Sequence, residues 1–342
     1  MKTAVLAGCG AMSAGWLSAI TKAPLADQVR VVGLVDLNPE TARLRAEQFG
    51  LTNAVIGTDL ADMLAELKPD IVFDVVVPVA RHDVVATALA HGCNVLSEKP
   101  MATSIEAGRD LIDKARAAGK VHAVIQNRRF IAGVRRLQQF IAAGGIGELT
   151  ALHCDFFIGA HFGGFREDMD NVLLLDMAIH TLDAARFMSG KVPLAVYCQQ
   201  SNPRGSWYRH GAAANAIFEF SDDVVFTYRG SWVAEGANTS WEGVWRIIGT
   251  KGTITWDGGD AFSARLVDDG PDLLRPSHEV ALPEPTDIEQ THGHASVIAE
   301  FLSALDEGRA PETDGADNIK SLAMVFGAIE SARTGQRVRI AV

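Results

Sequence analysis

The segment Thr3–Ser13, with the sequence TAVLAGCGAMS, decides the fold of the N-terminal part of the chain. Its apolar first half predicts a buried strand, and the pattern Gly8-x-Gly10-x-x-Ser13 follows directly and opens a helix. In such a turn the first glycine permits the tight bend. The second lets the backbone approach a pyrophosphate, and the third, small residue lets the helix pack on the strand. Serine departs from the usual glycine or alanine at that third position. We expect a dinucleotide to contact Gly8, Gly10, Ala11 and Met12.

The rest of residues 1–126 repeats this alternation of strand and helix. Short, Val-rich apolar runs are typical of strands buried on both faces of a parallel sheet. Amphipathic segments with helix caps lie between them, such as Asn38-Pro39 before one helix and Ser104 before another. The runs are residues 3–7, 29–35, 54–56, 71–77, 94–96 and 121–125. This rhythm predicts an α/β Rossmann domain over residues 1–126.

The pattern changes from residue 127 to residue 342. Alternating, β-rich segments take over, and turn residues such as Ser221–Asp223 separate them. Helices are expected at residues 134–143, 175–188, 294–305 and 318–334. We expect strands at residues 149–158, 192–199, 213–220, 224–232, 245–249, 253–256, 262–267 and 338–341. The sequence predicts an α+β C-terminal domain with a large, mainly antiparallel open sheet, which binds substrate and forms the oligomer.

Charge and composition narrow the possible partners. The net charge of the 342 residues is −11, which argues against nucleic-acid binding because that depends on basic patches. No apolar stretch has the 18 or more residues of a membrane span, so no membrane contact is expected. The four cysteines are scattered without CxxC spacing, which predicts no metal site and suggests a reduced, cytoplasmic setting.

Asp36 refines the expected nucleotide. It ends the second predicted strand, about 20 residues after the glycine turn, where a carboxylate binds the ribose hydroxyls. The next residue is Leu37, which offers nothing to a 2′-phosphate. The cofactor expected is therefore NAD, with NADP less favoured. The alternative is that Asp36 is an ordinary residue of the turn before a helix.

Two further motifs carry reactive side chains. Glu98-Lys99-Pro100 follows the fifth predicted strand, and ligands of open α/β sheets bind at the carboxyl ends of strands. Asp176 and His180 lie four residues apart in a strongly apolar helix, so they share one face. Such polar groups need partners or a chemical task. A surface lysine and a structural Asp–His pair remain the alternatives at this point, and a metal site lacks a third ligand.

Taken together, these motifs resemble those of the Gfo/Idh/MocA family, which includes glucose-fructose oxidoreductase and inositol 2-dehydrogenase. The matching pieces occur in the same order along almost the whole chain: the Gly8–Ser13 turn, Glu98-Lys99-Pro100, Gln126–Phe130, Asp176-x-x-x-His180 and Glu330–Gly335. One departure is the segment Asp170–Val172, which is glycine-rich in many relatives. We therefore transfer no substrate specificity.

The resemblance implies an NAD(P)-dependent dehydrogenase that oxidises a secondary hydroxyl of a sugar, an inositol-like polyol or a sugar derivative. Lys99 and His180 would handle the hydroxyl proton, and Asp176 would support them. Hydride would pass to the nicotinamide. A histidine suits proton transfer near neutral pH, and burial or a nearby positive charge can adapt a lysine to it. Which of the two is the immediate base stays open.

The resemblance also assigns binding residues. Val77, Pro78 and His82 would lie near the cofactor, and Glu98, Lys99 and Asn127 would approach its nicotinamide half. Arg128 matches a substrate-contacting position. His161, Trp232 and Trp241 are weaker candidates for lining the substrate pocket, because aromatic residues on a sheet more often pack in the core. Asp183, one turn beyond His180, could support the Asp176–His180 pair or contact substrate.

Two other functions fit the same motifs. One is a cofactor-binding sensor or regulator without turnover, which would be free to lose Lys99 or His180. The other is a sugar–sugar oxidoreductase that retains and recycles its cofactor. A broad open sheet usually needs cover, and relatives use this face to form dimers and tetramers, so a homodimer or homotetramer is expected.

Overall fold

The computed structural model describes residues 1–342, which divide into two compact units. The first unit contains Met1–Asn127 together with His292–Leu322, and the second contains Arg128–Thr291 together with Ala323–Val342. The sequence predicts a single domain boundary near residue 127. In the structure, a later segment of 31 residues, His292–Leu322, also belongs to the first unit.

The first unit is built on a six-stranded, fully parallel sheet with the strand order β3-β2-β1-β4-β5-β6. This is the doubly wound order of dinucleotide-binding folds, whose strand order reverses between β1 and β4. The central strands are buried, as their Val-rich sequences predict. The strands are β1 (Lys2–Ala7), β2 (Val29–Val35), β3 (Val55–Gly57), β4 (Ile71–Asp74), β5 (Asn94–Ser97) and β6 (His122–Val124).

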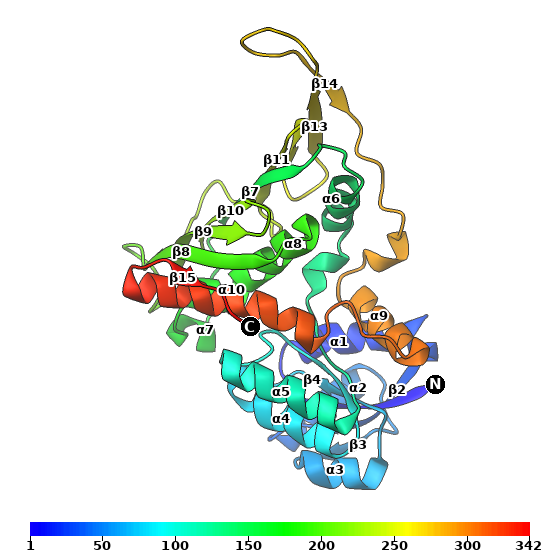
Figure 1. Ribbon diagram of the computed structural model, residues 1–342. Coiled ribbons are helices and arrows are strands. Elements are labelled where there is room, and N and C mark those ends of the chain that lie inside the picture. Colours follow the sequence, from blue (N-terminus) through cyan, green and yellow to red (C-terminus); the bar gives the residue numbers. More distant parts are fainter. The chain divides into compact units, whose positions relative to one another are not determined.

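Helices connect these strands, and local signals define their ends. The Asn38 side chain accepts a hydrogen bond from Glu40 N at 3.1 Å, and Ser104 caps its helix in the same way through Ala107 N. Figure 1 shows helices α3, α4 and α5 side by side. The helical segments are α1 (Ser13–Ile20), η1 (Leu25–Asp27), α2 (Pro39–Gln48), α3 (Leu60–Leu67), α4 (Pro78–Ala90) and α5 (Ile105–Ala118).

The returning segment supplies α9 (His294–Glu307) and the first part of α10 (Gly315–Thr334). Helix α9 packs against α1. Val124 N at the end of β6 donates a hydrogen bond to Thr313 O at 3.0 Å. Sequence periodicity predicts these helices but cannot say which unit they join, because that depends on contacts between residues far apart in the chain.

The second unit is built on a nine-stranded sheet with the order β14-β13-β12-β11-β7-β10-β9-β8-β15. All neighbouring strands are antiparallel except β7 and β10, which pair in parallel with Phe226 opposite Leu152. The strands are β7 (Leu149–Phe157), β8 (Pro193–Ser201), β9 (Ala213–Phe220), β10 (Val225–Ser231), β11 (Val244–Gly249), β12 (Gly252–Trp256), β13 (Phe262–Val267), β14 (Ser277–Val280) and β15 (Val338–Arg339).

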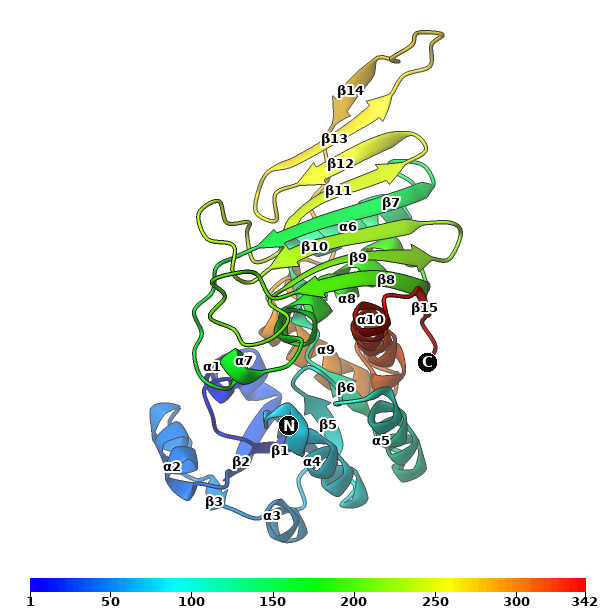
Figure 2. The same cartoon turned by 90° about the vertical axis from the view of Figure 1, so that its left-hand side faces the viewer.

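Helices cover one face of this sheet. Helix α6 (Ala132–Ala142) packs against α8 (Ile179–Ser189), which also contacts β7. Figure 2 shows the sheet in front of α6 and α8, with its other face open. Along β10 the buried Phe226 and Tyr228 alternate with exposed or half-buried residues, as expected for a sheet with one covered face.

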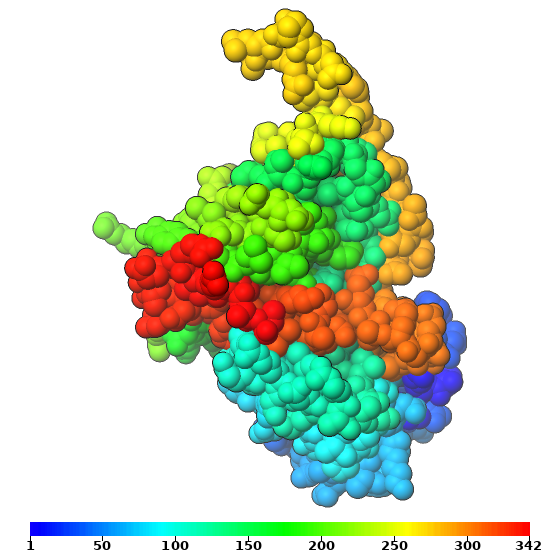
Figure 3. Space-filling view, in the orientation of Figure 1, coloured from blue at the N-terminus to red at the C-terminus, as the bar shows by residue number.

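Four other features complete the second unit. The 3₁₀ turn η2 (Asn127–Phe130) leads into α6, and η4 (Ile288–Gln290) precedes α9. The π-helix η3 (Leu173–Ala178) continues directly into α8, and the short helix α7 (Phe165–Asp168) precedes it. The hairpin formed by β13 and β14 projects from the second unit (Figure 3).

None of the helices in the structure combines the length and apolar composition needed to cross a membrane.

The structure confirms the fold class predicted for both parts. The short elements α7 and β14 were not predicted, because each has four residues and carries little periodicity. The helix expected from Leu175 begins earlier and as a π-helix, in which hydrogen bonds span five residues instead of four.

Candidate active site

The glycine turn after β1 has the geometry that close approach of a nucleotide requires. Gly8 has a φ of 91°, and a Cβ there would lie 2.7 Å from the backbone carbonyl of Val75, so another residue would displace the β4 loop. A Cβ on Gly10 would meet nothing within 4 Å, so that side of the turn is open. Exposed Met12 follows, and Ser13 starts α1.

Asp36, predicted to bind ribose, lies directly beside this turn. Its Oδ2 accepts a hydrogen bond from Cys9 N at 2.8 Å, and its Oδ1 accepts one from Asn38 N at 2.9 Å. These bonds fix the carboxylate at the carboxyl end of β2. Burial raises the pKa of the Cys9 thiol to about 12, and the charge of Asp36 adds to the shift, so Cys9 is a packing residue and not a nucleophile.

Arg45 on α2 braces the same turn and was missed by the sequence analysis. Its Nε donates to Cys9 O at 3.2 Å and to Ser13 Oγ at 3.1 Å, and its Nη2 donates to Gly10 O at 3.1 Å. The buried Ser13 in turn donates to Gly10 O at 2.6 Å. Serine at the third motif position therefore closes the turn with its hydroxyl. No sequence pattern identifies Arg45, because it lies nine positions after Asp36 in a helix outside the glycine motif.

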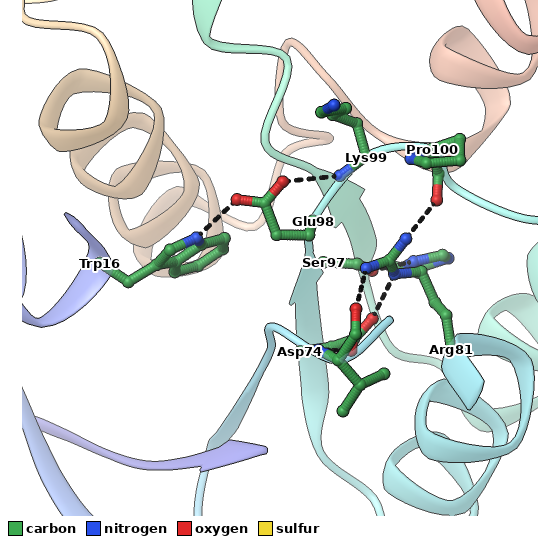
Figure 4. A network of polar contacts seen from close by, with 9 residues as sticks. Trp16, Asp74, Arg81, Ser97, Glu98, Lys99 and Pro100 are labelled. Carbon is green, nitrogen blue, oxygen red and sulfur yellow. Dashed lines mark hydrogen bonds and ion pairs between the residues drawn. The ribbon is translucent and has the colours of Figure 1, made fainter. Parts of the chain in front are cut away.

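The loop after β4 contains Val77 and Pro78, which begin α4 next to the glycine turn. Buried Arg81 ties this loop to the next one. Its Nε donates to Asp74 Oδ2 at 2.8 Å, and its two Nη atoms donate to Val76 O and Pro100 O, both at 2.6 Å (Figure 4). Arg81 thus joins the carboxyl ends of β4 and β5 and positions the Lys99-Pro100 loop.

His82, predicted to lie near the cofactor, is on the side of α4 that faces α5. Its Nε2 lies 2.6 Å from Asp110 Oδ2, and Lys114 contacts the same carboxylate. The hydrogen bonds from Lys114 and His82 lower the pKa of Asp110. The structure places the His82 imidazole in this half-exposed cluster between two helices.

Glu98, directly after β5, is buried and accepts hydrogen bonds from two parts of the first unit. Its Oε1 accepts from Trp16 Nε1 at 2.9 Å, and its Oε2 accepts from Lys99 N at 3.1 Å (Figure 4). Burial alone would raise the pKa of Glu98. The nearby His294 imidazole, the charge of Lys99 and the hydrogen bond from Trp16 outweigh it, so the pKa lies below its usual value. Glu98 is therefore an anion that fixes the backbone before Lys99, whose side chain points away from Arg81 in Figure 4.

In the second unit, Asp176 lies in η3 and the half-buried His180 in the first turn of α8. Asp176 Oδ2 accepts a hydrogen bond from Arg166 Nε at 2.7 Å. Arg166 on α7 also stacks over the rings of Phe162 and Phe165, with its guanidinium carbon 5.1 and 4.8 Å from their centroids. π-Helical turns occur frequently at functional sites.

Asp183 has a different setting on the same helix. Both of its oxygens accept from Arg129, at 2.7 and 2.6 Å, and Arg186 lies 3.5 Å away. The Asp183 side chain is 1% exposed and that of Arg129 5%. This bidentate, buried pair ties α8 to η2, so we assign Asp183 a structural role.

The remaining candidates in the second unit occupy an aromatic region next to α7. Arg128 forms an ion pair with Glu242, and burial raises the pKa of Glu242 against the effect of that charge. His161 stacks on Trp207 with ring centroids 3.7 Å apart, and its Nε2 lies 3.0 Å from Glu235 Oε1.

Two tryptophans in this region differ in exposure. Trp232 is buried, with its ring 5.3 Å from that of Phe162 and 5.7 Å from that of Tyr208. Trp241 is 45% exposed and packs against the same Phe162. The structure therefore shows Trp232 as a core residue and Trp241 as a more accessible one.

Two family models match the chain in succession. Residues 2–126 match the oxidoreductase family with an NAD-binding Rossmann fold, and residues 134–255 match the GFO/IDH/MocA C-terminal domain. The chain belongs to the GFO/IDH/MocA family. It is an NAD-binding oxidoreductase, which confirms the family, the enzyme class and the cofactor expected from the sequence.

Curated relatives match along most of the chain. An uncharacterized protein, y4oX of Sinorhizobium fredii, is 27% identical over 97% of this chain and 94% of its own length. The 1,5-anhydro-D-fructose reductase of Ensifer adhaerens is 25% identical over 91% of both chains. Among solved structures, an oxidoreductase from Agrobacterium radiobacter in complex with NAD+, L-tartaric acid and magnesium has the same fold. Its TM-score is 0.84 at 22% identity, and the match covers 99% of this chain and 98% of that one.

For this GFO/IDH/MocA oxidoreductase, sequence reasoning found the motif residues but missed their supports. Arg45, Trp16 and His294 in the first unit and Arg166 in the second contact motif residues through the fold. Of these four residues, only Arg166 had a signal in the sequence. It ends the stretch His161–Arg166, which contains two glycines and two phenylalanines.

Proposed function

We propose that this oxidoreductase oxidises a secondary hydroxyl of a sugar, an inositol-like polyol or a sugar derivative, with NAD as hydride acceptor. Relatives named for such substrates support this. They include the D-apiose dehydrogenase of Rhizobium rhizogenes, 26% identical over 91% of this chain, and the D-glucoside 3-dehydrogenase of Escherichia coli, 31% identical over 48%. The structural observation that carries the proposal is the anchoring of Lys99 at the carboxyl end of β5 by Glu98.

The residues at this edge of the first unit fit NAD. Gly8 allows the tight bend, Gly10 leaves the turn open to close backbone approach, Asp36 is fixed beside it, and the buried Asn127 Oδ1 has no hydrogen-bond partner in the chain. When bound, NAD would supply a nicotinamide ring that accepts hydride. Asp36 would hold the adenosine ribose through its hydroxyls, and the α1 N-terminus would stabilise the pyrophosphate charge.

We assign the proton chemistry to Lys99 and His180, as the family resemblance implies. Oxidation of an alcohol releases a hydroxyl proton as the carbon loses hydride, so a base is needed at the hydroxyl oxygen. Either a Lys99 amine or a neutral His180 imidazole could accept that proton. Asp176, held by Arg166, would stabilise the positive charge that results.

The test is a screen for NAD reduction with aldoses, inositols, sugar acids and glycosides, using the wild type and the variants Lys99→Met and His180→Asn. We expect a substrate-dependent increase in NADH absorbance for the wild type. Each variant should lose at least about 10²-fold in turnover, the usual contribution of a general acid or base, while still binding NADH. Wild-type turnover by both variants would contradict the proposal.

The same screen separates the two alternatives. A sensor would bind NADH without turning over any substrate. A sugar–sugar oxidoreductase would release nicotinamide cofactor only on denaturation of the purified protein, and would reduce one sugar while oxidising another without net NADH formation. The presence of both Lys99 and His180 favours the dehydrogenase, because a sensor has no need of either.

We further propose that the protein is a homodimer or homotetramer that uses the open face of the nine-stranded sheet. Apolar residues on four strands of this face are about half exposed, among them Tyr197 on β8, Ile217 on β9 and Val244 on β11. A hollow of about 670 Å³ lies between them, lined also by His153 and Arg229. Light scattering should show an oligomer for the wild type and a smaller species for Ile217→Arg.

The proposed cytoplasmic location is supported by the four cysteines, which are all free and buried.

A further inference from the structure

His294, the first residue of α9, contacts residues that follow β5 and β6 in the first unit. Its Nε2 lies 3.8 Å from Glu98 Oε1, and its Nδ1 lies 3.2 Å from Asn127 Nδ2. Its ring also meets the edge of Trp16, with centroids 6.3 Å apart. Glu98 and Asn127 follow strands of the sheet, and Trp16 lies in α1. His294 comes from 167 residues beyond Asn127 in the chain.

The charges around His294 determine which ring nitrogen carries the proton. Glu98 is held as an anion, so its carboxylate can only accept. The contact at 3.8 Å is longer than a hydrogen bond, yet the field of the carboxylate favours the proton on the facing nitrogen, Nε2. The other nitrogen, Nδ1, is then an acceptor. It takes a hydrogen bond from Asn127 Nδ2.

This bond fixes the orientation of the Asn127 amide. With Nδ2 turned to His294, the amide oxygen Oδ1 points the other way, where it is buried without a partner in the chain. A buried amide oxygen without a donor costs about 1–3 kcal/mol, so this site calls for a donor from outside the chain. Asn127 follows β6, at the edge where open α/β sheets bind their ligands.

We propose that His294 is a positioning residue that sets the polarity of the Asn127 amide, so that Oδ1 accepts a hydrogen bond from the carboxamide N–H of the nicotinamide. Glu98 sets the tautomer of His294, the tautomer sets the rotamer of Asn127, and Asn127 selects a carboxamide over a group without a donor. The proposal depends on NAD binding and not on the identity of the substrate.

The test measures the dissociation constants of three nucleotides for the wild type and His294→Phe. NADH carries the carboxamide, reduced nicotinic acid adenine dinucleotide carries a carboxylate instead, and ADP-ribose lacks the ring. Phenylalanine keeps the ring and removes both nitrogens. We expect a Kd for NADH about three- to tenfold higher in the variant, the worth of one hydrogen bond, and an unchanged Kd for ADP-ribose. The preference for NADH over the carboxylate analogue should shrink.

Three further variants keep the test decisive. Asn127→Ala should reproduce the loss for NADH, and the double variant should lose no more than either single one, because both act through one hydrogen bond. His294→Gln, which retains a donor and an acceptor, should recover much of the affinity. His91→Phe, which changes an exposed histidine at the C-terminal end of α4, is the matched control and should change nothing.

Equal losses for NADH and ADP-ribose would show a merely structural role for His294 and overturn the proposal. No loss in His294→Phe, or additive losses in the double variant, would do the same. If the wild type fails to oxidise any sugar but shows the predicted pattern of dissociation constants, the proposed substrate class fails and this inference stands.

Discussion

Two aspartates of one continuous helical segment, Asp176 and Asp183, each pair with an arginine, but in opposite settings. Asp183 and Arg129 are bidentate and buried, and together they tie α8 to η2. In the other pair, Arg166 Nε donates to Asp176 Oδ2 at 2.7 Å, and the Asp176 and Arg166 side chains are 11% and 23% exposed. An Arg–Asp pair in a helix is therefore not by itself a functional signal. Burial of both partners separates a structural pair from one whose arginine is accessible to water.

The two arginines also reach their aspartates differently. Arg129 comes from a turn within the core, whereas Arg166 comes from α7, which follows two glycines with positive φ, Gly163 and Gly164. After α7, Asn171 also has a positive φ. We predict that the Arg166 pair rearranges more readily than the buried Arg129 pair when a substrate binds.

The largest expected effect is on stability at the buried pair. Asp183→Asn leaves the Arg129 guanidinium without its counter-charge, and breaking a buried pair in this way costs about 3–5 kcal/mol. Urea unfolding followed by circular dichroism should show this loss. Asp168→Asn is the matched control, because its exposed pair with Arg209 should contribute nothing measurable. An unchanged free energy of unfolding in Asp183→Asn would remove the distinction between the two pairs.

The second prediction concerns the pair of Asp176 and Arg166, where we expect a larger effect on activity than on stability. Asp176→Asn should lower turnover about 10²-fold, because the charge that supports proton transfer is lost. The free energy of unfolding should fall by less than in Asp183→Asn, because water can partly solvate the Arg166 guanidinium, whose side chain is 23% exposed. Steady-state kinetics and urea unfolding on the same preparation check both parts. A large loss of stability with turnover unchanged would mean that Asp176 is structural like Asp183.

The third prediction concerns how the stability of the protein changes with pH because of one buried histidine. Burial lowers the pKa of His122 to about 3, and the charge of Arg81 adds to the shift. Between that value and about 6.5, the unfolded chain binds a proton that the folded chain refuses. Stability should therefore fall as pH falls through this window, by about 1.4 kcal/mol per pH unit.

His122→Gln, which can keep a hydrogen bond to Ser97, should flatten that slope. Urea unfolding at pH 7, 6 and 5 measures it for both proteins. An identical slope in the variant would assign the acid sensitivity to other groups.

The smallest expected effect concerns Arg166. Arg166→Gln should lower turnover about fivefold, the worth of an accessible ion pair, and Arg166→Lys should restore part of it. Stability should stay close to that of the wild type. Equal turnover in Arg166→Gln and the wild type would mean that Asp176 acts without this partner.

Local signals in the sequence predicted much of the first unit. The glycine turn, Asp36 and the caps at Asn38 and Ser104 all lie where local backbone chemistry places them. In the second unit, alternation predicted the strands but could not predict the parallel pairing of β7 with β10, which depends on contacts far apart in the chain.

The supports of the site were harder to predict for the same reason. His294 and Arg45 are unremarkable in the sequence and gain their roles only when the chain folds back on the motif residues. The π-helix at Asp176 was also not foreseen, since a spacing of four residues predicts an ordinary α-helical turn. The roles of Lys99, Asp176 and His180 therefore stay predictions that rest on the family resemblance.

The most direct test of the central claim is the fate of the carbon-bound hydrogen. A sugar or polyol that reduces NAD in the screen is supplied with deuterium on the carbon that bears the secondary hydroxyl. The NADH formed, or recovered after denaturation, is then weighed by mass spectrometry. We expect NADH heavier by one mass unit, with the label on the nicotinamide ring. Unlabelled NADH, or no NADH with any compound of the panel, would contradict it.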